Sequence, residues 1–223
     1  MLFFDVGGTL LQFNIEPSQL FSKVLKDHGI AAEPAQLYRT MREVESLYPL
    51  PIGASATSEG DYWRAFDGRI LERLGIAPTP DVLDEVAERF RNELSLDAFP
   101  ESVEVLRALW EMGVPLGIIS NASHGILGDL ARNHLSGFFE HVVYSQAVGA
   151  AKPDARIFHE ALRLFGAPPE LTWHVGDNVE ADVAGARAVG IHPVLVDRHK
   201  RHVGVAAPRV EDLRDLVAMV EEA

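Results

Sequence analysis

The first ten residues constrain the fold of this chain more than any other stretch. An apolar run over residues 1–4 ends in Asp5, and two glycines, Gly7 and Gly8, follow before Thr9. The run is typical of a buried strand, and paired glycines let the backbone turn sharply and approach a ligand closely. Because ligands of open α/β sheets bind outside the carboxyl ends of the strands, Asp5 is predicted to lie where chemistry can take place. Taken alone, the stretch is equally typical of a strand that ends in an ordinary turn.

Composition narrows the class of protein. The 223 residues, 47% hydrophobic and 24% charged, indicate a soluble globular chain with one domain plus an insertion, or with two small domains. A net charge of -13 argues against a nucleic-acid partner, since such binding depends on Lys and Arg that neutralise phosphates. The absence of cysteine excludes disulfides, thiolate catalysis and zinc–thiolate sites. No apolar run approaches membrane-spanning length and no secretory segment opens the chain, so we expect a cytoplasmic protein without membrane association, monomeric or homodimeric.

Residues 15–95 carry a helical pattern that no strand-like run interrupts. Apolar side chains recur there at helical spacing in four segments, and Pro, Gly and Ser residues mark a loop at 49–58. The first predicted helix ends near Gly29, and the others cover about 34–48, 61–74 and 81–94. Because the block lies between the first strand and everything that follows, it is predicted to be an inserted helical domain.

From Pro100 onward, short apolar runs alternate with helical segments. This alternation predicts parallel strands covered by helices on both faces, which is the arrangement of a Rossmann-like α/β sheet. The predicted strands cover 114–119, 142–144, 172–175 and 193–196, and the predicted helices cover about 100–112, 126–134, 154–165, 179–189 and 210–220. These strands complete a sheet with the first one, so the core is predicted to be discontinuous, 1–14 plus 96–223, around the helical insertion at 15–95.

Polar side chains also follow a later strand and precede a later helix. Ser120 and Asn121 come directly after the strand at 114–119, where a hydroxyl and an amide can hydrogen-bond a phosphate or carboxylate oxygen, although both residue types also cap helices. Lys152 precedes Pro153 just before a helix, where it could offset a cluster of anions, although a single lysine is usually solvated.

Two further carboxylates follow the strand at 172–175. Asp177 comes directly after Gly176, and Asp182 lies in the first turn of the next helix, where the helix dipole alone would favour an acid. Together with Asp5 they would form an oxygen-rich site of the kind that magnesium prefers. Chance rarely sets polar groups at successive strand ends of one sheet, so the order of these residues favours a functional site.

The motifs, taken in this order, resemble those of the haloacid dehalogenase superfamily, whose members are mainly phosphatases. The resemblance covers the whole chain, and the helical insertion is similar to the cap of the C1-type subfamily. Asp5 with Thr9 resembles the first motif, Ser120 the second, Lys152-Pro153 the third, and Gly176-Asp177 with Asp182 the fourth.

The resemblance implies a role for each matched position. Asp5 would be the nucleophile, forming an aspartyl-phosphate from a small phosphorylated substrate, with Lys152 assisting catalysis. Magnesium would be held by Asp5, the backbone carbonyl of Gly7, Asp177 and Asp182. The phosphoryl group would be held by Gly8, Thr9, Ser120, Asn121 and Lys152.

The sequence departs from the pattern of the family at one position. Phosphatases of the family carry a second aspartate two residues after the nucleophile, which serves as the general acid and base, whereas this chain has Gly7. A backbone carbonyl can still contact the metal, but proton transfer by this residue is lost, and such catalysis is typically worth ~10²–10⁴-fold. We therefore expect slow hydrolysis of ordinary phosphomonoesters, and better activity on substrates with good leaving groups.

Several alternatives stay open at this point. A dehalogenase would also lack the second aspartate but would not carry the Gly176-Asp177 pattern. A phosphonatase-like enzyme would rely on a cap lysine, and Lys23 and Lys26 are better explained as a solvated helix face. A binding or regulatory protein on an enzyme scaffold is a third possibility, and the phosphate-binding turn of actin-like sugar kinases, which needs a second nucleotide-binding half, is a fourth.

The helical insertion is expected to supply specificity, because insertions at strand ends line the site. Trp63 and Arg64 stand out as an aromatic side chain and a cation that could touch a substrate. Trp63 is also at helical spacing with Phe66 and Ile70, which is typical of the packed interior of such an insertion. His174 on the strand at 172–175 is predicted to be packed, and no role is assigned to it.

Overall fold

The computed structural model describes residues 1–48, 56–202 and 204–222. The chain divides into two compact units. The first unit, the core, combines Met1–Gln12 with Leu96–Ala223, and the second, the cap, is the continuous segment Phe13–Ser95.

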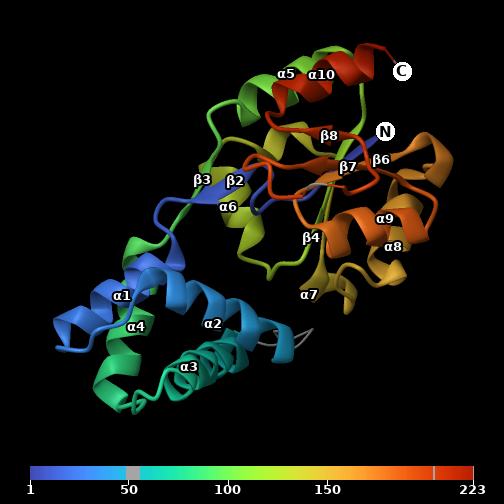
Figure 1. The fold of residues 1–223 in the computed structure, drawn as a ribbon. Helices are drawn as coiled ribbons and strands as arrows, with labels where there is room; N and C mark the ends of the chain where they lie inside the picture. Colours follow the sequence, from blue (N-terminus) through green and yellow to red (C-terminus); the bar gives the residue numbers. More distant parts are fainter. Residues whose placement is uncertain (49–55, 203, 223) are drawn as a thin grey trace. The chain divides into compact units, whose positions relative to one another are not determined.

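The core is built on a six-stranded sheet (Figure 1), in the order β5-β4-β1-β6-β7-β8, and its five strand pairings are all parallel. The strands are β1 (Leu2–Phe4), β4 (Leu116–Ser120), β5 (His141–Tyr144), β6 (Trp173–Gly176), β7 (His192–Val196) and β8 (Arg209–Val210). The strand that opens the chain therefore lies between β4 and β6, and the residue after it, Asp5, lies in the middle of the carboxyl edge.

Helices cover both faces of this sheet (Figure 1). One face packs against α5 (Ser102–Glu111), α6 (Ile126–Arg132) and α10 (Arg214–Glu221), and the other packs against α8 (Ala155–Phe165) and α9 (Gly185–Ala188). Side chains alternate between the faces along a strand, so Leu2 and Phe4 enter the first layer while Phe3 enters the second. Burying each such side chain stabilises the fold by about 1.5–3 kcal/mol. The predicted α/β class with a Rossmann-like parallel sheet is confirmed.

The cap contains four helices, α1 (Pro17–Asp27), α2 (Pro34–Leu47), α3 (Ala56–Arg73) and α4 (Pro80–Glu93). Three of them begin with proline, whose fixed φ and missing N–H suit the first helical turn. Their inward faces form a separate hydrophobic cluster, in which Phe21, Leu37, Phe66 and Ile70 are buried. Within the described ranges, none of the helices has both the length and the apolar composition needed to span a bilayer.

The shortest strands are not predicted by the sequence. Leu11–Phe13 forms β2, which pairs with β3 (Leu96–Ala98) in a two-stranded sheet, and neither strand is among those predicted. Likewise, the closing helix begins only at Arg214, because the preceding residues include β8. Strands of two or three residues are too short to show a period of two, so backbone pairing alone reveals them.

Two helical predictions also need correction. The helix expected over 179–189 begins as a π-helical segment, Val179–Ala184, before α9. Most of the loop predicted at 49–58 lies outside the described residues, but Ala56 and the two residues after it belong to α3. Neither a wide helical turn nor an early helix start has a distinct signature in the spacing of apolar residues.

Candidate active site

Three carboxyl ends of adjacent strands bring the predicted residues together. Asp5 follows β1, Ser120 ends β4 and Asp177 follows β6, and the sheet order makes these three strands neighbours. The backbone N–H of Asp5 donates to the carbonyl of Val175 at 2.8 Å, which continues the β1–β6 pairing to the first residue after β1. Asp5 and Ser120 are only 8% and 4% exposed, so both lie at the base of the site.

Lys152 is the buried cation at the centre of this group. Its Nζ donates to Oδ1 of Asp5 at 2.7 Å, to Oδ1 of Asp182 at 2.6 Å and to the carbonyl of Ile119 at 2.8 Å. All three ammonium protons are thereby used, which satisfies a charge that would be costly to bury alone. Among the described residues, Oδ2 of Asp5 receives only a long contact of 3.4 Å from the Thr9 hydroxyl.

Asn121 holds the backbone at Lys152. Its amide nitrogen donates to the carbonyl of Lys152 at 2.9 Å, and its side-chain oxygen accepts from the N–H of Lys152 at 2.7 Å. The pair of bonds joins the end of β4 to the segment that carries the lysine, which fixes where the lysine side chain starts. Contact between Asn121 and a phosphoryl group stays a prediction.

Asp182 is held from several directions. Its Oδ1 accepts from Lys152 and lies 2.8 Å from Nε2 of His174, and its Oδ2 accepts from the backbone N–H of Asn178 at 2.9 Å. His174 is fully buried on β6, with Phe158 edge-on to its ring. The sequence indicated that this histidine is packed, but not that it holds a carboxylate of the site.

Charge and burial shift the pKa values of these groups in different directions. Burial raises the pKa of Asp177 to about 7, with the negative charges of Asp5 and Asp182 adding to the effect. Burial also raises the pKa of Asp5, since it outweighs the attraction of Lys152. Burial would raise the pKa of Asp182, but Lys152 and His174 outweigh this effect and hold the pKa well below its usual range. Burial lowers the pKa of His174, which favours the neutral form of the ring beside Asp182.

The donor set fits a hard divalent cation. Carboxylate oxygens of Asp5, Asp177 and Asp182 lie within 4.8 Å of one another. Oxygen ligands of this kind suit magnesium, which is usually bound by one or two carboxylates together with substrate oxygens and water. A cation here would relieve the repulsion that raises the pKa of Asp177. Because Asp182 already accepts three donors, Asp5 and Asp177 are the more available ligands.

Two glycines make room for these carboxylates. A Cβ at Gly8 would lie 2.3 Å from Oδ2 of Asp177, and one at Gly176 would lie 2.2 Å from Cγ of Asp182. Gly8 also has a φ of +79°, a conformation that side chains rarely adopt. Gly7 is different, because no described atom beyond its neighbours lies within 4 Å of the position that a Cβ would take.

An arginine, Arg198, holds the turn after Asp5. Nη2 of Arg198 donates to the carbonyl of Thr9 at 2.8 Å, and Nη1 bonds to Oε1 of Glu101 at 2.5 Å. The guanidinium also stacks 3.6 Å from the centre of the Phe99 ring. Neither Arg198 nor Glu101 was singled out from the sequence, because residues so far from the motif give no local signal.

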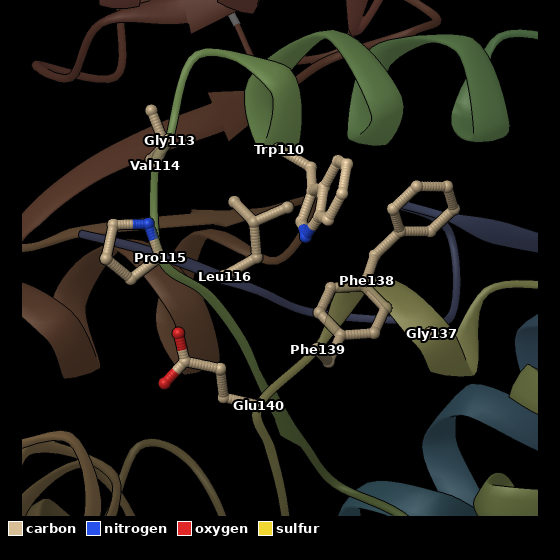
Figure 2. Close-up of a pocket in the computed structure, with 9 residues that line it drawn as sticks. All are labelled: Trp110, Gly113, Val114, Pro115, Leu116, Gly137, Phe138, Phe139 and Glu140. Carbon is tan, nitrogen blue, oxygen red and sulfur yellow. The ribbon is translucent and has the colours of Figure 1, made fainter.

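The hollow drawn in Figure 2 lies at the opposite edge of the sheet. Its volume is about 220 Å³, and it is lined at the start of β4 by Pro115 and Leu116 and on either side by Trp110, Phe138 and Phe139. Pro115 and Leu116 lie at the amino end of β4, whereas Ser120 closes its carboxyl end. Among the described residues of its lining Glu140 alone is charged, so this hollow lacks the cluster of carboxylates around a lysine that marks the carboxyl edge.

A family model described as haloacid dehalogenase-like hydrolase matches residues 1–190. The chain belongs to this family. The predicted superfamily is thereby confirmed, and the protein is a hydrolase.

Individual relatives of this HAD-like hydrolase carry different names. A glyceraldehyde 3-phosphate phosphatase of Methanothermobacter thermautotrophicus is 40% identical over 206 residues, which cover 88% of this chain and 84% of that protein. The human haloacid dehalogenase-like hydrolase domain-containing protein 3 is 30% identical over 209 residues, covering 88% and 81% of the two chains. Among solved structures, an L-2-haloacid dehalogenase is 26% identical with a TM-score of 0.78, covering 99% and 97%.

Proposed function

We propose that this HAD-like hydrolase is a magnesium-dependent phosphatase that transfers the phosphoryl group of a small phosphorylated metabolite to Asp5. The observation that carries the proposal is the pairing of two opposite features around one carboxylate. Lys152 donates to one oxygen of Asp5. Asp177 adds a second carboxylate close enough to Asp5 for one metal ion to contact both. This combination suits phosphoryl transfer, in which positioning and charge neutralisation supply most of the catalysis.

Each residue has a defined part in the proposed reaction. A carboxylate oxygen of Asp5 would bond to phosphorus while the bond between phosphorus and the ester oxygen breaks, and water would then release phosphate and restore the carboxylate. Bound magnesium, held by Asp5, Asp177 and the Gly7 carbonyl, would neutralise charge on the phosphoryl oxygens. Ser120 and Lys152 would hold those oxygens, with Gly8 and Thr9 forming the turn beneath them. His174 and Lys152 would keep Asp182 ionised and in place.

Gly7 limits the reaction at one step. The ester oxygen leaves with an electron pair and needs a proton, and position 7 supplies none. We therefore expect acyl and aryl phosphates, whose leaving groups are stable as anions, to be hydrolysed faster than alkyl phosphates. The phosphatase name of the 40% identical relative supports phosphorylated metabolites as the substrate class.

Dehalogenation is the second candidate, and the similarity to a solved haloacid dehalogenase favours it. In that reaction Asp5 would displace halide from carbon, which requires neither magnesium nor an acid at position 7. Asp177 argues against it, because a third carboxylate near the nucleophile has no use there and adds repulsion.

The assay that separates these candidates uses p-nitrophenyl phosphate, acetyl phosphate and 2-chloropropionate, each with magnesium or with EDTA. The proposal expects phosphate release that needs magnesium and falls by at least ~10³-fold in Asp5→Asn. Asp215→Asn, an exposed aspartate on α10, is the matched control and should retain activity. Magnesium-independent halide release would support the dehalogenase instead, and turnover that survives Asp5→Asn would contradict both.

A further inference from the structure

A cavity of about 630 Å³ lies within the cap unit. Its walls come from all four cap helices, and they include the three exposed aromatic side chains of Phe13, Tyr38 and Trp63. These side chains are 46%, 44% and 45% exposed, so they present ring surface to the cavity instead of filling the cap interior. The volume is sufficient for a small organic molecule.

One buried carboxyl group lines this cavity. Asp67, on α3, is 7% exposed, and it follows Phe66 in the buried face of the helix. Among the described residues no hydrogen bond or ion pair reaches its side chain, whereas buried carboxylates in proteins are almost always paired. The contrast with Asp182, which accepts three donors, shows how unusual this is within the same chain.

The charged groups around the cavity do not serve as partners for Asp67. Arg42 on α2 pairs with Glu45 at 2.6 Å, and Arg64 on α3 pairs with Asp84. The remaining charged residues of the lining are Glu16 at the start of α1 and Arg91 on α4. Burial alone raises the pKa of Asp67 to about 7, with no opposing effect from a nearby cation.

We infer that the cap cavity is a binding site for an organic ammonium ligand with an apolar or aromatic body, whose charge is paired by Asp67. The ligand would supply the cation that the fold leaves out, and the aromatic walls suit both its apolar body and the face of a cation. Neither the family nor the proposed phosphoryl transfer assigns Asp67 a role, and binding at this site does not require hydrolysis.

Three ligands of similar size test the charge requirement. Calorimetric titration of the whole protein would compare 2-phenylethylamine, 2-phenylethanol and 3-phenylpropionate at pH 8. The amine should bind at least ~10-fold more tightly than the alcohol, and the carboxylate should not bind. Equal affinity for the alcohol, or tighter binding of the carboxylate, would overturn the assignment of an ammonium site.

Two variants locate the binding. Asp67→Asn keeps the size of the side chain and should weaken amine binding at least ~10-fold without affecting the alcohol, whereas Asp61→Asn, an exposed aspartate of the same helix, should bind like the natural protein. Ala87→Phe places a ring in the cavity and should weaken all binding. If the amine binds equally to all of these variants, it does not occupy this cavity.

The pH dependence of amine affinity distinguishes binding by Asp67 from a purely structural role of this residue. An alkyl amine stays charged from pH 6 to pH 8, since its pKa lies near that of lysine, ~10.4. With the pKa of Asp67 at about 7, the ionised fraction of the free site rises about tenfold over this range, and amine affinity should rise with it. Asp67→Asn should abolish the rise, and a flat profile in the natural protein would contradict the proposal.

Discussion

The core and the cap each bury acidic side chains, but they treat them differently. In the core, Asp182 accepts from Lys152 and from the Asn178 backbone and lies against His174, so its geometry is fixed before any ligand arrives. In the cap, Asp67 is buried to a similar degree and no described group pairs with it. A buried carboxylate that accepts hydrogen bonds is held in a fixed position, whereas one without partners can still bind a cation.

The largest expected effect comes from removing the cation of the core. Lys152→Met would leave Asp5 and Asp182 buried without their counter-ion, which should lower the free energy of unfolding by ~3–5 kcal/mol and abolish phosphatase activity. Urea denaturation and the phosphate-release assay measure the two effects. Lys23→Met, at an exposed position in the cap, is the control and should change stability by less than ~1 kcal/mol. A fully stable Lys152→Met variant would show that the core does not depend on this pairing.

Asp67 should make the folded protein less stable as the pH rises. Its pKa is about 7 in the folded chain and near 3.9 when unfolded, so the folded state binds more protons between these values and stability falls as pH increases. Between pH 5 and pH 8 this loss amounts to ~2.5 kcal/mol. Asp67→Asn should remove that part of the decline, as measured by denaturant unfolding at several pH values. An unchanged decline would indicate that Asp67 titrates normally in the folded protein.

The two glycines of the first motif should tolerate side chains unequally. Gly8→Ala would push a Cβ against the Asp177 carboxylate at a φ of +79°. We expect a loss of ~1–3 kcal/mol in stability, together with weaker binding of magnesium. Gly7→Ala, one position earlier with open space around it, is the matched control and should be nearly neutral. Similar effects of both substitutions would contradict the steric argument.

Gly7→Asp is expected to have the smallest effect in energy, but it bears directly on mechanism. The space around Gly7 accepts a side chain, and a carboxyl there could protonate the leaving oxygen. Alkyl phosphate hydrolysis should rise about tenfold or more, while acetyl phosphate, whose leaving group needs no proton, should change little. If Gly7→Asp leaves alkyl phosphate hydrolysis unchanged, the missing acid is not what limits the enzyme.

The sequence predicted the larger elements of this fold because their signals are local. Asp5 and Asp177 follow buried strands directly, and parallel strands deliver such residues to one edge whatever the intervening chain does. Lys152 was singled out by its position before a helix, but its pairing with both Asp5 and Asp182 could not be deduced, because burial of a lysine depends on the folded neighbourhood.

Other features cannot be predicted from the sequence because they depend on contacts in the folded chain. His174 was expected to be packed, and only the structure shows its ring against Asp182. The unpaired state of Asp67 is likewise a property of the folded cap, since the sequence shows only one acid among many on α3. The short strands β2, β3 and β8 lack enough residues for a pattern to appear.

The central place of β1 also has a consequence for the order in which the chain becomes structured during synthesis. Leu2 pairs with Leu116 on one side and with Trp173 on the other, so β1 must wait until Trp173 has been made before both of its neighbours exist. The cap, in contrast, is one continuous segment and has its own hydrophobic cluster as soon as residue 95 has emerged. Asp5 therefore acquires its surroundings late in synthesis, which delays assembly of the candidate site until most of the core has been made.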